Sequence, residues 1–121
     1  MNSKDVLKLI AKSLNKHKAQ EITVLKIDDL TVLSDYFVIA GGTSNTQVRA
    51  LAADIEEDLA KVGVKLLHTE GYDSASWILL DFGGVIVHLF LKDSRMFYSL
   101  EHLWSDAKEI SFDELIEEEE K

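Results

Sequence analysis

Residues 76–91 read SWILLDFGGVIVHLFL, and this stretch predicts the centre of the fold. Two strongly apolar runs flank a pair of glycines, Gly83 and Gly84. A glycine pair between such runs indicates a tight hairpin, because the favoured two-residue turns need positive φ angles. We therefore predict two antiparallel strands, at 76–82 and 85–91, joined at the glycines.

The predicted turn fixes which side chains share a face, because side chains alternate between the two faces along each strand. With the glycines as the loop, Trp77 lies opposite Phe90 and Asp81 lies opposite Ile86. One face is wholly apolar and is expected to be core: Ile78, Leu80, Phe82, Val85, Val87 and Leu89. The other face, called the mixed face below, adds an aspartate and a histidine to large apolar groups: Trp77, Leu79, Asp81, Ile86, His88 and Phe90.

The mixed face has two possible environments. Burying Asp81 and His88 requires partners for both, whereas leaving the whole face in water exposes a large apolar patch. In one arrangement the second helix of the chain covers the face, and Asp81 and His88 pair with each other or with the backbone. In the other the face is a protein interface, whose centre favours tryptophan and other aromatic residues with a few polar groups. The pattern leaves both open.

The rest of the chain predicts one α+β (α/β) domain with a mixed sheet of about five strands packed by helices. Helical spacing of apolar residues indicates a helix at 3–18, with Ser3 as its N-cap and His17 packed and hydrogen-bonded. A second helix begins after Ser44 and ends near Gly63. The remaining predicted elements are strands at 21–28, 36–40 and 64–70 and helices at 98–107 and 111–121.

Composition limits the class of protein. The chain has 121 residues, 46% of them hydrophobic, which suits a single domain with a real core. There is no cysteine, which excludes disulfides and thiolate zinc sites. No apolar run approaches the ~18 residues of a membrane span, and the first residues do not resemble a secretory signal. We therefore expect a cytoplasmic protein with no membrane partner.

Charge points to the kind of partner. Thirteen basic and 22 acidic residues give a net charge of −9, a field that repels phosphate and disfavours direct, sequence-specific nucleic-acid binding. An acidic surface favours basic protein partners, although the same charge also serves solubility alone. Residues 106–121 hold eight acidic and two basic residues. We expect a domain at 1–107 and a solvated or disordered acidic tail at 108–121.

Sequence motifs typical of catalytic, cofactor-binding or metal sites are weak, so no catalytic residue, cofactor or metal is predicted. Gly41-Gly42-Thr43-Ser44 precedes a helix, as phosphate-binding loops do, but it lacks a Walker lysine and more simply makes a turn. Asp54 and Glu56 stand two apart on a helix, which points their carboxylates about 200° apart. The spacing of the histidines matches no metal motif. A nucleotide-handling enzyme built on the glycine pair stays as an alternative.

Three blocks of sequence together resemble the ribosomal silencing factor family, also called Iojap-like. They are DYFVIAGGTSNTQV at 35–48, Glu70-Gly71 with ASWILLDFGGVIVH at 75–88, and a block of Arg95, Tyr98, Leu100-Glu101, Leu103-Trp104 and Asp106-Ala107. The resemblance covers about residues 3–107. It implies a fold similar to a nucleotidyltransferase core without the catalytic acids.

The resemblance also implies a function. Members of this family bind the large ribosomal subunit through ribosomal protein L fourteen, block joining of the small subunit and repress translation when nutrients are scarce. Some act in assembly of the large subunit, which is kept as an alternative for this chain. Self-association through the mixed face, giving a homodimer, is also open.

Site residues follow from the matched blocks and the mixed face. Trp77 is expected to be the aromatic anchor, and Asp81, Glu70 and Glu101 are expected to meet basic side chains. His88 is expected to orient Asp81 or bond a backbone carbonyl. The other candidate partner-binding residues are Leu79, Phe90, Tyr98 and Trp104. Many relatives carry an aspartate where this chain has Gly84, which removes one acidic group near the expected site.

Overall fold

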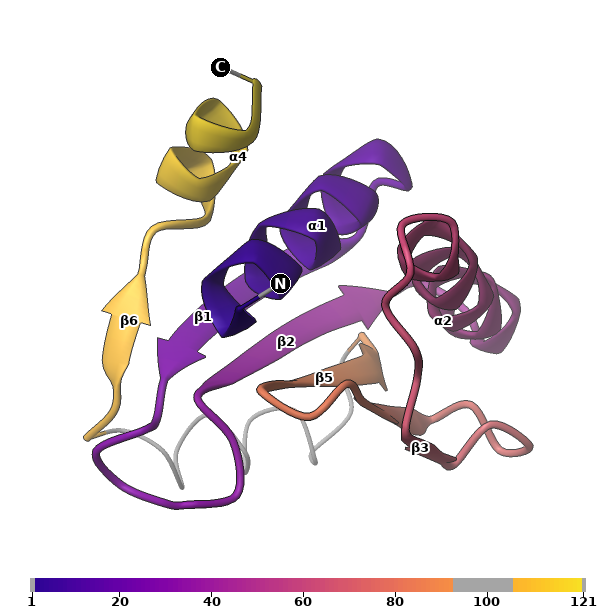
Figure 1. The fold of residues 1–121 in the computed structure, drawn as a ribbon. Coiled ribbons are helices and arrows are strands. Elements are labelled where there is room, and N and C mark those ends of the chain that lie inside the picture. The colour runs from indigo at the N-terminus through magenta and orange to yellow at the C-terminus, as the bar shows by residue number, and fades with distance from the viewer. Residues whose placement is uncertain (1, 93–105, 121) are drawn as a thin grey trace.

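The computed structural model describes residues 2–92 and 106–120 (Figure 1). In chain order the described elements are α1 Ser3–Lys16, β1 Gln20–Lys26, β2 Tyr36–Gly42, α2 Asn45–Ala60, β3 His68–Glu70, β4 Trp77–Asp81, β5 Val85–Leu91, β6 Lys108–Ile110 and α4 Phe112–Glu120. The helix predicted at 98–107 lies mostly outside the described residues. Within the described ranges, no helix combines the length and the apolar character that crossing a bilayer requires.

The strands form one mixed sheet in the order β3-β4-β5-β2-β1-β6. Strands β2 and β5 run parallel at the centre, and the other neighbours pair antiparallel. The predicted class, a single α+β domain with a mixed sheet, is confirmed. The sixth strand is β6, which the sequence pattern did not reveal because it is only three residues long and strongly charged.

The predicted hairpin register is confirmed. Trp77 pairs with Phe90 and Asp81 pairs with Ile86. The turn is closed by the amide of Phe82, which donates to the carbonyl of Val85 at 3.0 Å. Gly83 has a φ of 92°, a conformation that glycine adopts without steric penalty.

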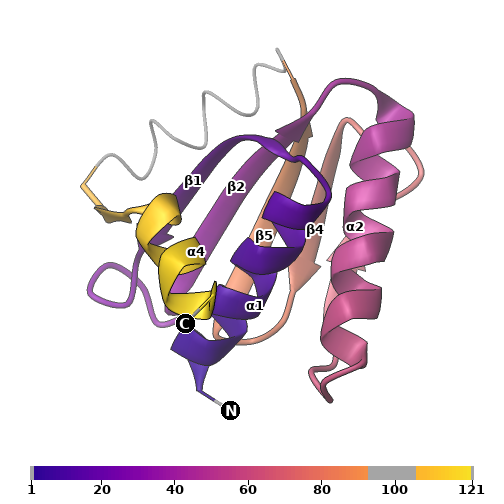
Figure 2. The same ribbon diagram turned by 90° about the horizontal axis from the view of Figure 1, so that it is seen from above.

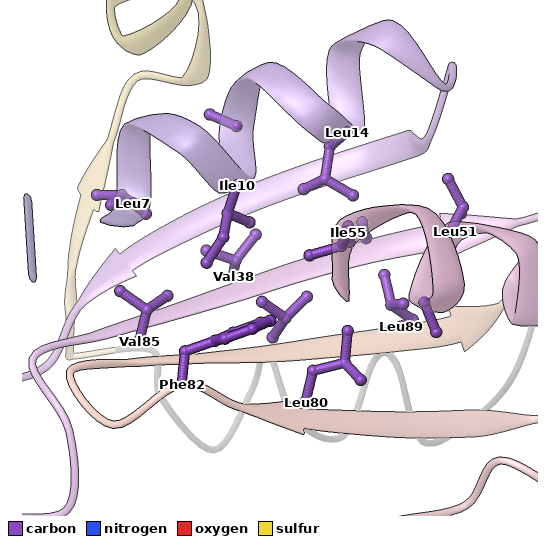
Figure 3. Close-up of a cluster of buried hydrophobic side chains, with 14 of the residues drawn as sticks. Leu7, Ile10, Leu14, Val38, Leu51, Ile55, Leu80, Phe82, Val85 and Leu89 are labelled. Carbon is purple, nitrogen blue, oxygen red and sulfur yellow. The ribbon is translucent and has the colours of Figure 1, made fainter. Parts of the chain in front are cut away.

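Helices α1 and α2 lie side by side on one face of the sheet (Figure 2). Figure 3 shows their apolar side chains meeting the hairpin face that was predicted to be core. The central members of this cluster are Leu7, Ile10, Leu14, Leu51, Ile55, Leu80, Val85 and Leu89. Helix α2 therefore covers the wholly apolar face, and the arrangement in which it covers the mixed face is wrong.

The first residues of α1 and α2 are each capped by a side chain. The side chain of Asn2, and not Ser3 as predicted, caps α1 by accepting from the amide of Asp5 at 2.9 Å. The Ser3 hydroxyl instead donates to Asp35 Oδ2 at 2.6 Å. The Ser44 cap of α2 is confirmed, since its hydroxyl accepts from the amide of Gln47 at 3.1 Å.

The acidic end of the chain packs on the domain. Strand β6 pairs with β1, placing Glu109 opposite Leu25, and α4 then lies against α1 (Figure 2). Leu115 of α4 is only 1% exposed. The expectation of disorder in the tail is wrong for residues 108–117, because apolar side chains spaced among the exposed acids supply a buried face.

Candidate functional site

Exposure of the mixed face changes from the centre of the sheet to one edge. Phe90 on β5 and Ile39 on β2 are fully buried. On the same face, the side chains of β4 and of Ile86, which is next to the hairpin turn on β5, are half-buried. The side chains of the edge strand β3 are exposed. We call the accessible part the open strip: Glu70, Trp77, Leu79, Asp81 and Ile86.

Trp77 is held by its neighbours. Its ring stacks on Phe90, with centroids 5.6 Å apart and planes 8° from parallel. Its indole Nε1 donates to Nδ1 of His88 at 3.2 Å. The polar edge of the indole is therefore bonded within the molecule, and the part of the ring that stays accessible is apolar surface.

His88 is 4% exposed among aromatic rings. Burial lowers the pKa of His88 to about 4, so the ring is neutral near neutral pH. Because Nδ1 accepts from the indole, the proton of the neutral ring is on Nε2, and this atom is buried with no partner among the described residues. The ring edge of Phe37 lies against His88, with centroids 4.8 Å apart.

Asp81 does not bond His88, which corrects the sequence-based expectation. Its Oδ1 accepts from the amide of Gly83 at 2.8 Å, so the carboxylate caps the hairpin turn. The short reach of an aspartate favours this local bond, since the turn amide is two residues away. His88 takes its hydrogen bond from Trp77 instead.

The edge strand adds a second carboxylate. Glu70 pairs with Leu79 across β3 and β4, and His68 pairs with Asp81, so these side chains share the face. The side chain of Glu70 is 67% exposed and lies 3.6 Å from Nε2 of His68. Glu70 thus lies beside Leu79, and Asp81 lies at the turn end of β4, beyond Leu79 from Trp77.

The predicted partner-binding residues differ in how accessible they are. Trp77, Leu79, Asp81 and Glu70 come together in the open strip, and Ile86, which was placed on the mixed face but not named as a contact, joins them. Strand alternation alone was the signal for Ile86. Phe90 is completely buried in a cluster with Phe37 and Ile39, so it does not belong to the open strip. The other three, Tyr98, Glu101 and Trp104, lie outside the described residues.

The Gly84 position is tightly packed. A Cβ built at Gly84 overlaps the hydroxyl of Ser3 and lies 3.4 Å from Oδ2 of Asp35. An aspartate at this position would require Ser3 to move and would place a second carboxylate beside Asp35. The glycine therefore suits the Ser3–Asp35 hydrogen bond in this chain.

Backbone amides of the candidate phosphate loop are already hydrogen-bonded within the chain. Gly41 and Gly42 lie within β2 and not in a turn. Strand β2 is paired with β1 on one side and with β5 on the other. The amide of Thr43 donates to Gln47 Oε1 at 2.6 Å, and the amide of Gln47 is taken by Ser44. These amides are not free to receive a phosphate.

The remaining candidate acids and histidines have structural contacts. His17, predicted to be hydrogen-bonded, bridges the helices by lying 3.2 Å from Asp54 Oδ2 and 3.3 Å from Asp58 Oδ2. Burial favours a raised pKa for Asp58, but the hydroxyl of Ser13, with Lys16 and His17, outweighs it, so the pKa of Asp58 lies below its ordinary value. In the part of the chain that is described, no three His, Cys, Asp or Glu residues are placed to hold a metal ion.

Comparison with known proteins decides the family. Residues 1–121 match the family described as ribosomal silencing factor during starvation, RsfS. The chain belongs to the ribosomal silencing factor family. The resemblance seen in the three sequence blocks is thereby confirmed.

Individual proteins are similar to this chain over most of its length. The ribosomal silencing factor of Bacillus subtilis is 40% identical over 107 residues, covering 88% of this chain and 91% of that protein. A crystal structure from Chromobacterium violaceum is 36% identical with a TM-score of 0.82, covering 93% of this chain and 92% of that one. A mouse protein named mitochondrial assembly of ribosomal large subunit protein 1 is 30% identical over 100 residues, 80% of this chain and 44% of the mouse protein.

Proposed function

We propose that this chain binds the large ribosomal subunit through ribosomal protein L fourteen, blocks joining of the small subunit and thereby represses translation under nutrient limitation. Family membership supports a role on the ribosome. The observation that carries the contact is the open strip. It presents apolar side chains next to two carboxylates, on the sheet face opposite α1 and α2.

The open strip has the composition of an interface centre. Trp77 and Leu79 supply apolar area, and tryptophan is among the residues that most often dominate binding energy. The carboxylates of Glu70 and Asp81 stand where basic side chains of the partner would meet them. Such charges mainly speed encounter and fix orientation, while the desolvated aromatic group supplies affinity.

The proposed surface also needs a rigid support, because ordering side chains on binding lowers affinity. Trp77 is already fixed by its stack on Phe90 and its bond to His88. Asp81 is fixed by the amide of Gly83. Trp77 and Asp81 therefore lose little conformational freedom when the strip docks.

The experiment is co-sedimentation of the protein with isolated large subunits, with small subunits as the control. We expect co-migration with large subunits only, weakening as salt rises because carboxylates contribute. Light scattering then follows joining of purified subunits, and we expect the protein to suppress it. Absence of co-migration with large subunits at low salt would contradict the proposal.

Assembly of the large subunit is the second candidate, favoured by the name of the mouse relative. A protein acting only in assembly binds immature large subunits and leaves joining of mature subunits unchanged. The light-scattering measurement therefore separates the two functions.

A further inference from the structure

The loop between β1 and β2 exposes three large apolar side chains. Leu30 is 46% exposed, Leu33 is 74% exposed and Val32 is fully exposed at 102%. We call these three residues the loop tip. Single exposed apolar residues are ordinary on protein surfaces, but three within four positions form a concentrated apolar projection.

The loop is locally ordered. The amide of Leu30 donates to the carbonyl of Ile27 at 2.9 Å, and the amide of Leu33 donates to Oγ1 of Thr31 at 3.2 Å. Ile27 itself is fully buried. The loop tip is therefore carried on a base that is bonded to the sheet.

The base of the loop is joined to the hairpin turn beside the open strip. The hydroxyl of Ser34 donates to the carbonyl of Gly83 at 3.2 Å, and the amide of Asp35 donates to the carbonyl of Gly84 at 3.0 Å. The amide of Gly83 is in turn held by Asp81 of the open strip. Both loops accordingly lie at the same end of the sheet (Figure 1). The loop tip thus continues the proposed docking surface around that end.

Charge around the loop tip restricts what it contacts. Asp28 and Asp29 directly precede the three apolar side chains in the chain and Asp35 follows them, while Nζ of Lys26 lies 3.5 Å from Oδ1 of Asp28. The excess of acidic residues in this loop disfavours contact with RNA phosphates and anionic lipid headgroups. It matches a basic protein surface that contains an apolar hollow.

A second copy of the chain fits less well. Symmetric contact between two loop tips brings identical carboxylates together, which is unfavourable. Three side chains also fall far short of the roughly 800 Å² per partner that a stable interface buries. A small apolar projection is better suited to supplement an existing contact than to form a dimer alone.

We propose that the loop tip is a second contact with the same basic protein partner, inserting Leu33 and Val32 into an apolar hollow next to the surface that receives Trp77. This inference rests on the proposed function and extends the contact beyond the open strip. The open strip supplies the charged and aromatic part of the interface, and the loop tip supplies a purely apolar part.

The test uses the variant Val32→Ser/Leu33→Ser in titrations with isolated large subunits. Val62→Ser is the matched control, because Val62 is 49% exposed at the helix-covered side of the sheet. We expect the double variant to bind about tenfold more weakly or worse, with the salt dependence of binding unchanged because no charge is removed. The control is expected to bind like the wild type.

The outcomes separate this inference from the proposed function. Wild-type affinity in the double variant, with the unaltered protein binding normally, overturns the second contact and leaves the proposed function standing. Absence of binding by the unaltered protein overturns both. A change in oligomeric state measured by light scattering, without a change in subunit binding, assigns the loop tip to a second copy and contradicts the inference.

Discussion

The indole nitrogen of Trp77 donates a hydrogen bond to Nδ1 of His88, 3.2 Å away on the neighbouring strand. The two rings are nearly parallel, with planes 24° apart and centroids 6.0 Å apart. This bond consumes the polar edge of the indole, so a partner meets Trp77 through apolar ring surface. It also makes a buried histidine the support of a half-buried aromatic side chain.

His88→Leu tests that support. The variant removes the acceptor, and we expect it to lose about 1 kcal/mol of stability and to weaken subunit binding by freeing the indole. His88→Asn offers an oxygen to the same donor and is expected to retain most of the binding. The resonance of the Trp77 indole N–H in NMR spectra reports the bond directly. Equal binding by both variants and the wild type would rule out a positioning role.

Acid should destabilise the protein through His88. Its pKa is about 4 in the folded state and 6.5 in the unfolded state, so the unfolded state binds the proton first as pH falls. Stability is therefore lost between pH 6.5 and 4, by about 3 kcal/mol in total, and this contribution is constant below pH 4. Urea unfolding across this range is expected to show a shallower loss in His88→Asn, whereas His68→Gln, at an exposed position, should follow the wild type.

Sequence patterns predicted the hairpin well because the residues that determine it are close together in the chain. The glycine pair determined the register, and alternation then assigned every side chain to its face. The same alternation did not reveal that Phe90 is buried while Trp77 is accessible. Phe90 packs in a buried cluster with Phe37 and Ile39 of β2, residues that are far from it in the chain.

The end of the chain shows a second limit. Its charge predicted a solvated tail, whereas Leu115 and its apolar neighbours are spaced to cover one side of α1. Net charge does not report the periodicity of the few apolar residues within an acidic segment. Similarly, Asp81 and His88 share a face as predicted, but they do not bond each other. Asp81 accepts from the turn amide of Gly83, and His88 accepts from the indole of Trp77.

Leu115→Ala measures how firmly the acidic end is attached. The side chain is almost completely buried, so we expect a loss of about 2 to 3 kcal/mol in the free energy of unfolding. Leu33→Ala, at an exposed position, is the control and should change stability by less than about 0.5 kcal/mol. Equal stability of the two variants would mean that α4 contributes nothing to the fold.

Gly71→Ala should be strongly destabilising because two effects act together. The φ of Gly71 is 81°, and a Cβ there overlaps the carbonyl oxygen of Trp77. Gly63 has a similar φ of 84° with no atom within 4 Å of its Cβ position, so Gly63→Ala isolates the backbone effect. We expect about 1 kcal/mol for Gly63→Ala and at least twice that for Gly71→Ala in thermal unfolding. Similar losses in both would show that the loop before β4 adapts.

We propose that the accessible ring of Trp77 anchors the protein to ribosomal protein L fourteen. Calorimetric titration of that isolated protein with the wild type and with Trp77→Ala tests it most directly, once circular dichroism has shown that the variant is folded. We predict that the variant binds at least about thirtyfold more weakly, corresponding to about 2 kcal/mol. Equal affinity of the folded variant and the wild type would contradict the account.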